Sequence, residues 1–453
     1  MKTTIAAVTC ALLTALSWTG AQAQSMLEAP LFILEPGDAT PVRDVRAVTS
    51  KHRIEPGSID FEGLLSLARR FMAAPGRLSP LRVPLQMGDG APEWVAFDAI
   101  GPAAGGRITL SGRLESRPAD YVVLVLSDNR LDGRLAVGGR HYLLRKLTGE
   151  HFLLEVDPAQ LPPEAPPSLP KPSPSQGAGT GVPAHGHPVV SCDHDMRKTL
   201  SVLALYTQAA SKGAAAAELA LNEGDGNPDP HEAITTAVIG ALETGNVALA
   251  SSDAETRFGT DIEPVPVPDY AELGDGDQAL AALYDPDHPL HQFASAQRAA
   301  TSANLVSLVI EHWEYCGGAP VMIAWNTHPD QTAYSVVVRG CLDAEDYSLA
   351  HELAHSMGSA HDYENAGVPG LFAFSYGYSD PDHKLSTIMA YECDGCIREA
   401  NYSNPAAAFQ PSGSSAPIAS GEGCEGSSAE PDCRKTDNAR SIDRAACQVS
   451  TWQ

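Results

Sequence analysis

The sequence predicts a mixed α/β domain over residues 197–453, preceded by a β-rich domain over residues 24–157. In the later region, candidate strands alternate with segments whose apolar residues recur at helical spacing. In the earlier region, short runs of β-forming residues are separated by Gly and Asn, as in hairpins. The stretch between them, 158–196, is rich in proline and has no apolar face to bury, so we expect an exposed, extended linker.

The first domain is expected to end in hairpin strands formed by DYVVLVLSDN, GRLAVGG, HYLLRKLTG and HFLLEVD. In the second domain, the strand candidates are TLSVLALYT, ANLVSLVIEHW, APVMIAW and YSVVVRG. A helical apolar stripe runs through HEAITTAVIGALETGNVALASS, while the prolines in TDIEPVPVPDY indicate a strand that lies at a sheet edge or ends there. The segment DAEDYSLAHELAHSMG is expected to be a helix that Asp343 or Asp346 caps and Gly358 ends.

Residues 1–23 have the features of a cleavable signal peptide. Lys2 provides the positive start, residues 5–18 a short apolar core, and Ala21 and Ala23 a small-x-small cleavage site. The apolar core is too short to cross a bilayer. We therefore expect a secreted protein without a membrane anchor.

Eight of the 9 cysteines follow the signal peptide, and all eight lie after Gly181. An even number of cysteines in an exported chain favours disulfides, whose connectivity the sequence leaves open. A single CxxC pair, Cys393 and Cys396, is expected to be a local disulfide rather than a redox or zinc pair.

His351, Glu352, His355 and His361 form the pattern HExxHxxGxxH. Two histidines four residues apart share one face of a helix, so both imidazoles can reach one zinc ion. A turn at Gly358 brings in His361 as the third ligand, because glycine adopts positive φ without strain. Glu352 is placed to act as general base toward a water that the metal activates, which is the chemistry of peptide hydrolysis.

This motif, followed by STIMAY with Met389, resembles the metzincin zinc metallopeptidases. The segments LSVLALYTQAA, TIMAYECDGC, NYSNPAAAF and TDNARSIDRAA are similar to the reprolysin-like secreted bacterial group that contains the peptidyl-Asp metalloendopeptidases. The resemblance implies a twisted, mostly parallel sheet with an antiparallel edge strand, APVMIAW, lining the cleft and an active-site helix behind it. It also implies that Met389 forms an apolar base under the metal.

The resemblance further implies that Asp362 takes part in a structural hydrogen bond near the metal. Tyr391 matches the spacing of an additional zinc-contacting tyrosine in astacins and serralysins, which reprolysin types generally lack. Its role stays open between metal ligation, oxyanion support and packing in the turn. An astacin- or serralysin-like peptidase is therefore a second interpretation.

The order of the parts suggests a zymogen, in which residues 24–157 are a propeptide that inhibits its own protease. The alternative is an accessory binding domain that stays attached. Cys192 is either a disulfide partner or a thiolate that occupies the zinc in the latent form. Calcium on so acidic a domain stays open, although DGNPD lacks the glycine and distal glutamate of an EF-hand loop.

The sequence thus predicts a secreted endopeptidase with one catalytic zinc ion and protein or peptide substrates. The alternative from another class is a catalytically silent zinc-bearing module that binds peptides or surfaces, but such a module would not need Glu352. The formal net charge of −26 argues against a nucleic-acid partner, because phosphate binding needs a basic surface.

The acidity also bears on specificity. Between residues 302 and 404, where the cleft should lie, the basic residues are Arg339, Lys384 and Arg398. The field of such a cleft favours cationic peptides. One well-placed arginine, Arg339 or Arg398, could reverse that preference locally.

Overall fold

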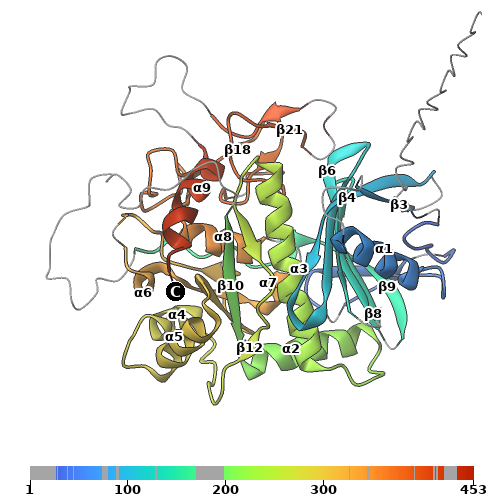
Figure 1. Ribbon diagram of the computed structural model, residues 1–453, viewed down its shortest axis with the longest axis horizontal. Coiled ribbons are helices and arrows are strands. Elements are labelled where there is room, and N and C mark those ends of the chain that lie inside the picture. Colours follow the sequence, from blue (N-terminus) through green and yellow to red (C-terminus); the bar gives the residue numbers. More distant parts are fainter. Residues whose placement is uncertain are drawn as a thin grey trace, which may run out of the picture.

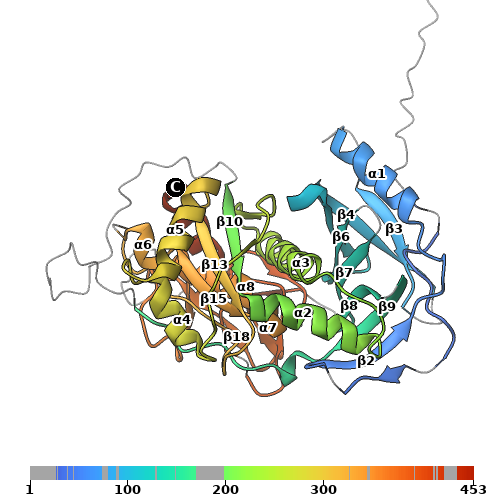
Figure 2. The same cartoon turned by 90° about the horizontal axis from the view of Figure 1, so that it is seen from below.

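The computed structural model describes residues 27–452 apart from 28, 38, 44, 74–79, 88–90, 128–129, 148, 170–197, 326, 344–346, 392, 412–413, 415–416 and 423–435. Two sheet-containing parts lie side by side, and helix α3 (Pro230–Ser251) runs between them (Figure 1, Figure 2). The predicted signal peptide and most of the predicted linker lie outside the described residues.

The first part is a sheet in the order β1-β2-β9-β8-β7-β6-β5-β4-β3, in which every neighbouring pair is antiparallel. The four segments predicted as hairpin strands form β6 to β9. Helix α1 packs on β3 and β4 through Leu64, Leu65 and Ala68, which share one helix face. The bounds are β1 Thr40–Pro41, β2 Val48–Arg53, α1 Phe61–Ala73, β3 Leu81–Leu85, β4 Glu93–Pro102, β5 Ile108–Leu114, β6 Arg117–Leu126, β7 Leu131–Val137, β8 Arg140–Leu147 and β9 Glu150–Val156, with 3-10 turns at Ala104–Gly106 and Pro158–Gln160.

The second part contains a sheet in the order β11-β10-β13-β15-β14, with β12 also paired to β10. All these pairs are parallel except β14 with β15. Successive residues of β10 face opposite cores: Leu203 packs with α4 and α5, and Ala204 with α2, α3 and α8. The mixed α/β class predicted for this region is confirmed.

The bounds in the second part are β10 Thr199–Tyr206, α2 Gln208–Leu221, β11 Arg257–Gly259, β12 Val265–Pro266, α4 Gly276–Leu283, α5 Pro289–Thr301, β13 Leu305–Ile310, β14 Gly317–Gly318, α6 Pro329–Thr332, β15 Tyr334–Val338, α7 Arg339–Asp343 and α8 Ser348–Ser356. The C-terminal region adds β16 Ala360–Asp362, β17 Tyr376–Gly377, β18 Ser379–Asp380, β19 Leu385–Ser386, β20 Ile397–Arg398, β21 Ala408–Phe409, β22 Ile418–Ala419 and α9 Asn438–Val449.

Two local predictions were wrong. The antiparallel edge strand is Gly317–Gly318, and the segment APVMIAW that follows it is buried but largely irregular. Helix α8 begins at Ser348 after Tyr347, whose φ is 57°, with no side-chain cap. Of the two predicted caps, Asp343 ends the preceding helix, and Asp346 lies outside the described residues. Tertiary contacts replace the cap here, since all residues of α8 are buried.

The two parts share a polar and apolar interface along α3. Arg134 Nη2 donates to the carbonyl of Ala237 at 2.8 Å, and Thr109 Oγ1 to Glu243 Oε1 at 3.1 Å. Tyr121 of β6 belongs to the same core as α3 and α8, and its hydroxyl lies 3.1 Å from that of Tyr347. Helix α3 is long and apolar enough to span a membrane, but 94% of its apolar window is buried, as in a core helix.

Candidate metal centre

Helix α8 positions the first two histidines and ends in a turn that delivers the third. Gly358 has a φ of 80°, and its amide donates to the carbonyl of His355 at 2.9 Å. The amide of Ser359 donates to the carbonyl of Ala354 at 3.0 Å. This pair of bonds is a Schellman motif, which satisfies the last carbonyls of the helix and reverses the chain. Strand β16 then carries His361 back over the helix.

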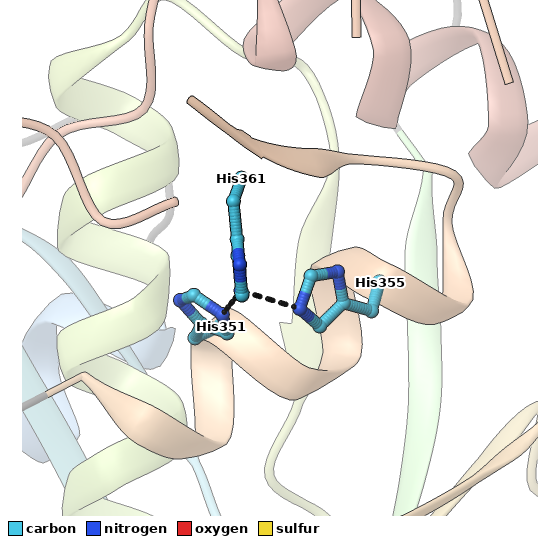
Figure 3. Close-up of side chains that lie close together, drawn as sticks. All are labelled: His351, His355 and His361. Atoms are coloured by element: carbon cyan, nitrogen blue, oxygen red, sulfur yellow. Dashed lines mark hydrogen bonds between the residues drawn. The ribbon is translucent and has the colours of Figure 1, made fainter. Parts of the chain in front are cut away.

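The three imidazoles converge, with His351 and His355 on the helix and His361 pointing between them (Figure 3). Nε2 of His361 lies 2.9 Å from Nε2 of His351 and 3.2 Å from Nε2 of His355. Each of the three residues is at most 1% exposed. The three ring nitrogens are close enough to one another to bind a single metal ion.

The hydrogen bonds behind the cluster leave the converging nitrogens available as ligands. Nδ1 of His351 lies 2.9 Å from the carbonyl of Ile388, and Nδ1 of His355 lies 2.7 Å from that of Ser359. Because a carbonyl accepts, each Nδ1 carries the proton and each Nε2 keeps a lone pair. A tetrahedral zinc ion about 2.0–2.1 Å from each nitrogen would set the nitrogens about 3.3 Å apart. The donor set therefore fits zinc.

The protonation states agree with ligation. Burial lowers the pKa of His355 to about 4, and burial with the neighbouring His355 lowers that of His361 to about 2. The pKa of His351 is likewise held well below its usual range, first by burial. All three rings are neutral near pH 7, which is the form that binds a metal.

Glu352 is enclosed beside the cluster. Its residue is 1% exposed, and Gly317 of the edge strand lies so close that a Cβ there would be 2.7 Å from Glu352 Oε1. Burial, and then the nearby carboxylate of Glu164, raise the pKa of Glu352 well above its usual range. The carboxyl groups of Glu352 and Glu164 are therefore close enough to affect each other's pKa.

The segment that contributes Glu164 lies along the edge strand. Cys316 N donates to the Pro163 carbonyl at 2.9 Å, and Ala165 N to the Gly317 carbonyl at 3.1 Å. Further along, the amide of Val321 donates to the carbonyl of Ser168 at 3.0 Å, and Ser168 pairs with Pro320 in parallel. The start of the linker, predicted to be exposed, thus pairs with the edge of the sheet, because the edge satisfies part of its backbone.

The residues around the cluster take distinct positions. Met389 is fully buried in the core that contains α8. Asp362 accepts hydrogen bonds from Tyr391 N at 3.0 Å and Asn365 Nδ2 at 2.8 Å. The Tyr391 ring packs 4.5 Å from that of His361, and its hydroxyl donates to the Ala165 carbonyl at 3.5 Å. Burial first, and then nearby carboxylates, raise the pKa of Tyr391 to about 12, so the phenol keeps its proton.

A family model described as metallo-peptidase family M12 matches residues 250–403, which include the three histidines and Glu352. These residues are similar to the reprolysin-like metallopeptidases. It is 26% identical over 299 residues to a peptidyl-Asp metalloendopeptidase of Stenotrophomonas maltophilia strain R551-3, and 26% over 298 residues to that of strain K279a. Each match covers 64% of this chain and 64% of the relative, so the chain spans just under two thirds of their length. Metalloproteinase-II from Bacteroides fragilis is 13% identical, with a TM-score of 0.43 over 74% of this chain and 90% of that one.

Two disulfides are described in the metallopeptidase domain. Cys393 pairs with Cys396, as predicted, and Cys316 with Cys341. The second bond ties the residue before β14 to α7 and so anchors the edge of the cleft. Cys192, predicted as a disulfide partner or latency switch, lies outside the described residues. Asp229 of the rejected calcium motif caps α3.

Glu164 and Ser348 meet beside Glu352, and neither was predicted from the sequence as a site residue. Ser348 Oγ donates to Glu164 Oε1 at 2.7 Å. A single glutamate in a proline-rich stretch gives no local signal, because its burial depends on the edge strand of a distant segment. A serine one helical turn before Glu352 was a signal that could have been used.

Proposed function

We propose that the protein is a zinc-dependent endopeptidase that is secreted as a zymogen. The observation that carries the proposal is the convergence of three buried, neutral histidines beside Glu352. The reprolysin-like domain and the names of the two relatives support it. Residues 1–23 support export through their sequence features alone.

His351, His355 and His361 would hold the zinc ion. Zinc at this place supplies Lewis-acid polarisation of the scissile carbonyl and lowers the pKa of water. Glu352 takes the proton of the attacking water and passes it to the leaving amine. Gly317 and Gly318 present the backbone groups of a sheet edge, along which an extended peptide can be held.

Latency would come from residues 24–157 together with the start of the linker. The segment 161–168 occupies the edge that a substrate needs, so a peptide cannot bind while the segment stays in place. This occupation supports a propeptide over an accessory domain. It also provides a latent arrangement that does not need Cys192.

The relatives are named for cleavage at Asp. We extend a preference for bonds next to an acidic residue to this chain. That proposal opposes the expectation from the net charge of the cleft.

Glu352→Gln tests the chemistry. The three imidazoles remain in this variant, so it should keep its zinc while peptide hydrolysis by the processed protein falls by several orders of magnitude. Glu364→Gln, at an exposed position of the same domain, is the matched control and should retain full activity. Zinc content and hydrolysis are measured on the same samples.

Substantial hydrolysis by Glu352→Gln at equal zinc content would refute the mechanism. Wild-type protein that binds zinc and peptides but cleaves none would instead favour the catalytically silent binding module.

A further inference from the structure

The carboxylate of Glu164 is enclosed by groups of the metallopeptidase domain. Its side chain has no exposed surface, and that of Arg398 is 9% exposed. Arg398 Nη1 lies 3.7 Å from Glu164 Oε1, the same oxygen that accepts from Ser348 Oγ. Ser348 opens α8 one turn before Glu352, and Arg398 ends β20. A cation and a hydroxyl from two separate elements therefore meet one carboxylate next to the proposed general base.

The position that Glu164 occupies favours a negatively charged side chain over a neutral one of the same shape. Burying a carboxylate is costly unless a cation and hydrogen-bond donors compensate it, and the same holds for a buried guanidinium. A neutral amide of the same shape would accept from Ser348 but would not neutralise Arg398. Glu164 reaches this place from a peptide laid along the sheet edge, which is how a substrate side chain would arrive.

We propose that Arg398, assisted by Ser348, receives an acidic side chain of the substrate beside the scissile bond, and that Glu164 fills this place in the uncut chain. The inference rests on the proposed endopeptidase function and identifies the specificity-determining residue of that site. Glu164 then occupies the position of the substrate side chain, and the pocket becomes accessible when Glu164 leaves with the propeptide.

Arg339, the other candidate from the sequence, has a different role. Its Nε and Nη2 bind the two oxygens of Glu311 at 2.6 and 2.8 Å. Glu311 belongs to the same domain, so this pair persists when the linker is cut. Glu164 belongs to the segment that leaves. Arg398 is therefore the arginine whose carboxylate partner is exchanged on activation.

The test uses the full chain, folded and then cut in its linker. Two peptides are compared that differ only in Asp or Asn next to the scissile bond. The wild type should show a kcat/KM at least about tenfold higher for the Asp peptide, since a charge-assisted contact is lost with Asn. Arg398→Gln should bring this ratio close to one, and Arg398→Lys should restore part of it. Arg339→Gln is the matched control and should leave the ratio unchanged.

A second arm uses the uncut chain. Glu164→Gln should raise hydrolysis by the uncut protein at least about tenfold, because the charge of Glu164 is lost. Glu115→Gln, a glutamate paired with Arg82 on the first sheet, should leave the uncut protein as inactive as the wild type. The zinc content of each variant checks that the site is folded.

A ratio that Arg398→Gln and Arg398→Lys both leave at the wild-type value, or equal cleavage of both peptides by the wild type, would overturn the inference while the endopeptidase function stands. Cleavage of neither peptide by the cut wild type would overturn the proposed function and this inference with it.

Discussion

Tyr391 contacts the third histidine, the aspartate that follows it, and the segment along the sheet edge. Its backbone amide donates to Asp362, its ring packs on His361, and its hydroxyl reaches the carbonyl of Ala165. The carbonyl it meets belongs to the residue that follows Glu164 in the cleft. A phenol that donates to a carbonyl of the segment 161–168 is placed to donate to a carbonyl of a substrate bound along the same edge.

We therefore expect Tyr391→Phe to keep one zinc ion per chain and to lower kcat of the cut protein about 10²-fold, the scale of losing one donor to a developing oxyanion. Zinc analysis and steady-state kinetics on the same preparation check this. Loss of zinc from Tyr391→Phe would show that the tyrosine is a ligand, as in the second interpretation of the sequence.

Ser348 is the second residue of the pocket that we propose for an acidic side chain of the substrate. Ser348→Ala removes one hydrogen bond to the carboxylate and leaves the charge of Arg398 in place. The preference for Asp over Asn should therefore fall less than in Arg398→Gln, with kcat/KM for the Asn peptide within about threefold of the wild type. Kinetics with the two matched peptides measure it, and an unchanged ratio would remove Ser348 from the pocket.

At the scale of elements, the turn after α8 decides whether the third histidine reaches the other two. Gly358 adopts a φ of 80°, and a Cβ there would lie 2.4 Å from the Cβ of Leu371. Both the backbone conformation and the close approach therefore require glycine. The Schellman bonds hold this turn rigidly against the helix, which fixes the direction of β16.

Gly358→Ala should lower the free energy of unfolding by about 1–3 kcal/mol and weaken zinc binding, because the strained turn displaces His361. Gly340→Ala is the control, since a Cβ there meets nothing within 4 Å, and it should leave the free energy of unfolding unchanged or raise it by up to about 1 kcal/mol. Urea unfolding and zinc titration of both variants provide the comparison. Equal stability of the two variants would refute the steric argument.

The prediction from sequence was strongest where one element carries its own signal. The spacing of His351, His355 and Gly358 is a local helical pattern that also specifies where the helix ends. The long apolar helix and the strand segments β10, β13 and β15 follow from the pattern of apolar residues, whereas their parallel pairing was expected only from the family resemblance. The edge strand and the start of α8 depended on neighbours distant in sequence. Buried contacts replaced the side-chain cap at α8, and no local propensity reports such contacts.

At the scale of the whole molecule, the first sheet holds the linker in the cleft. Polar contacts such as Arg134 with Ala237 and the shared core around Tyr121 fix the sheet to α3, and α3 packs on α8. The chain leaving β9 then has only a short path to the cleft at residues 161–168. Glu164 could not be found from the sequence because its burial depends on this docking.

The position of the activating cut follows from that arrangement. The bonds from 161 to 168 are held against the sheet edge. The proline-rich stretch predicted from the sequence continues to residue 196. We expect the N terminus of the active protein to lie after Ser168 and before Thr199. N-terminal sequencing and intact mass of the secreted protein test this. Fully active protein that still carries residues 24–157 covalently would refute the zymogen proposal.

Zinc titration tests the central claim most directly. The cut protein is stripped of metal with a chelator, and hydrolysis of a peptide is followed as zinc is returned. The three converging histidines predict no hydrolysis without metal, recovery that levels off at one zinc ion per chain, and no recovery in His361→Ala. Hydrolysis that persists undiminished in the zinc-free protein, or full recovery by His361→Ala, would contradict the assignment of this site as the centre of a zinc endopeptidase.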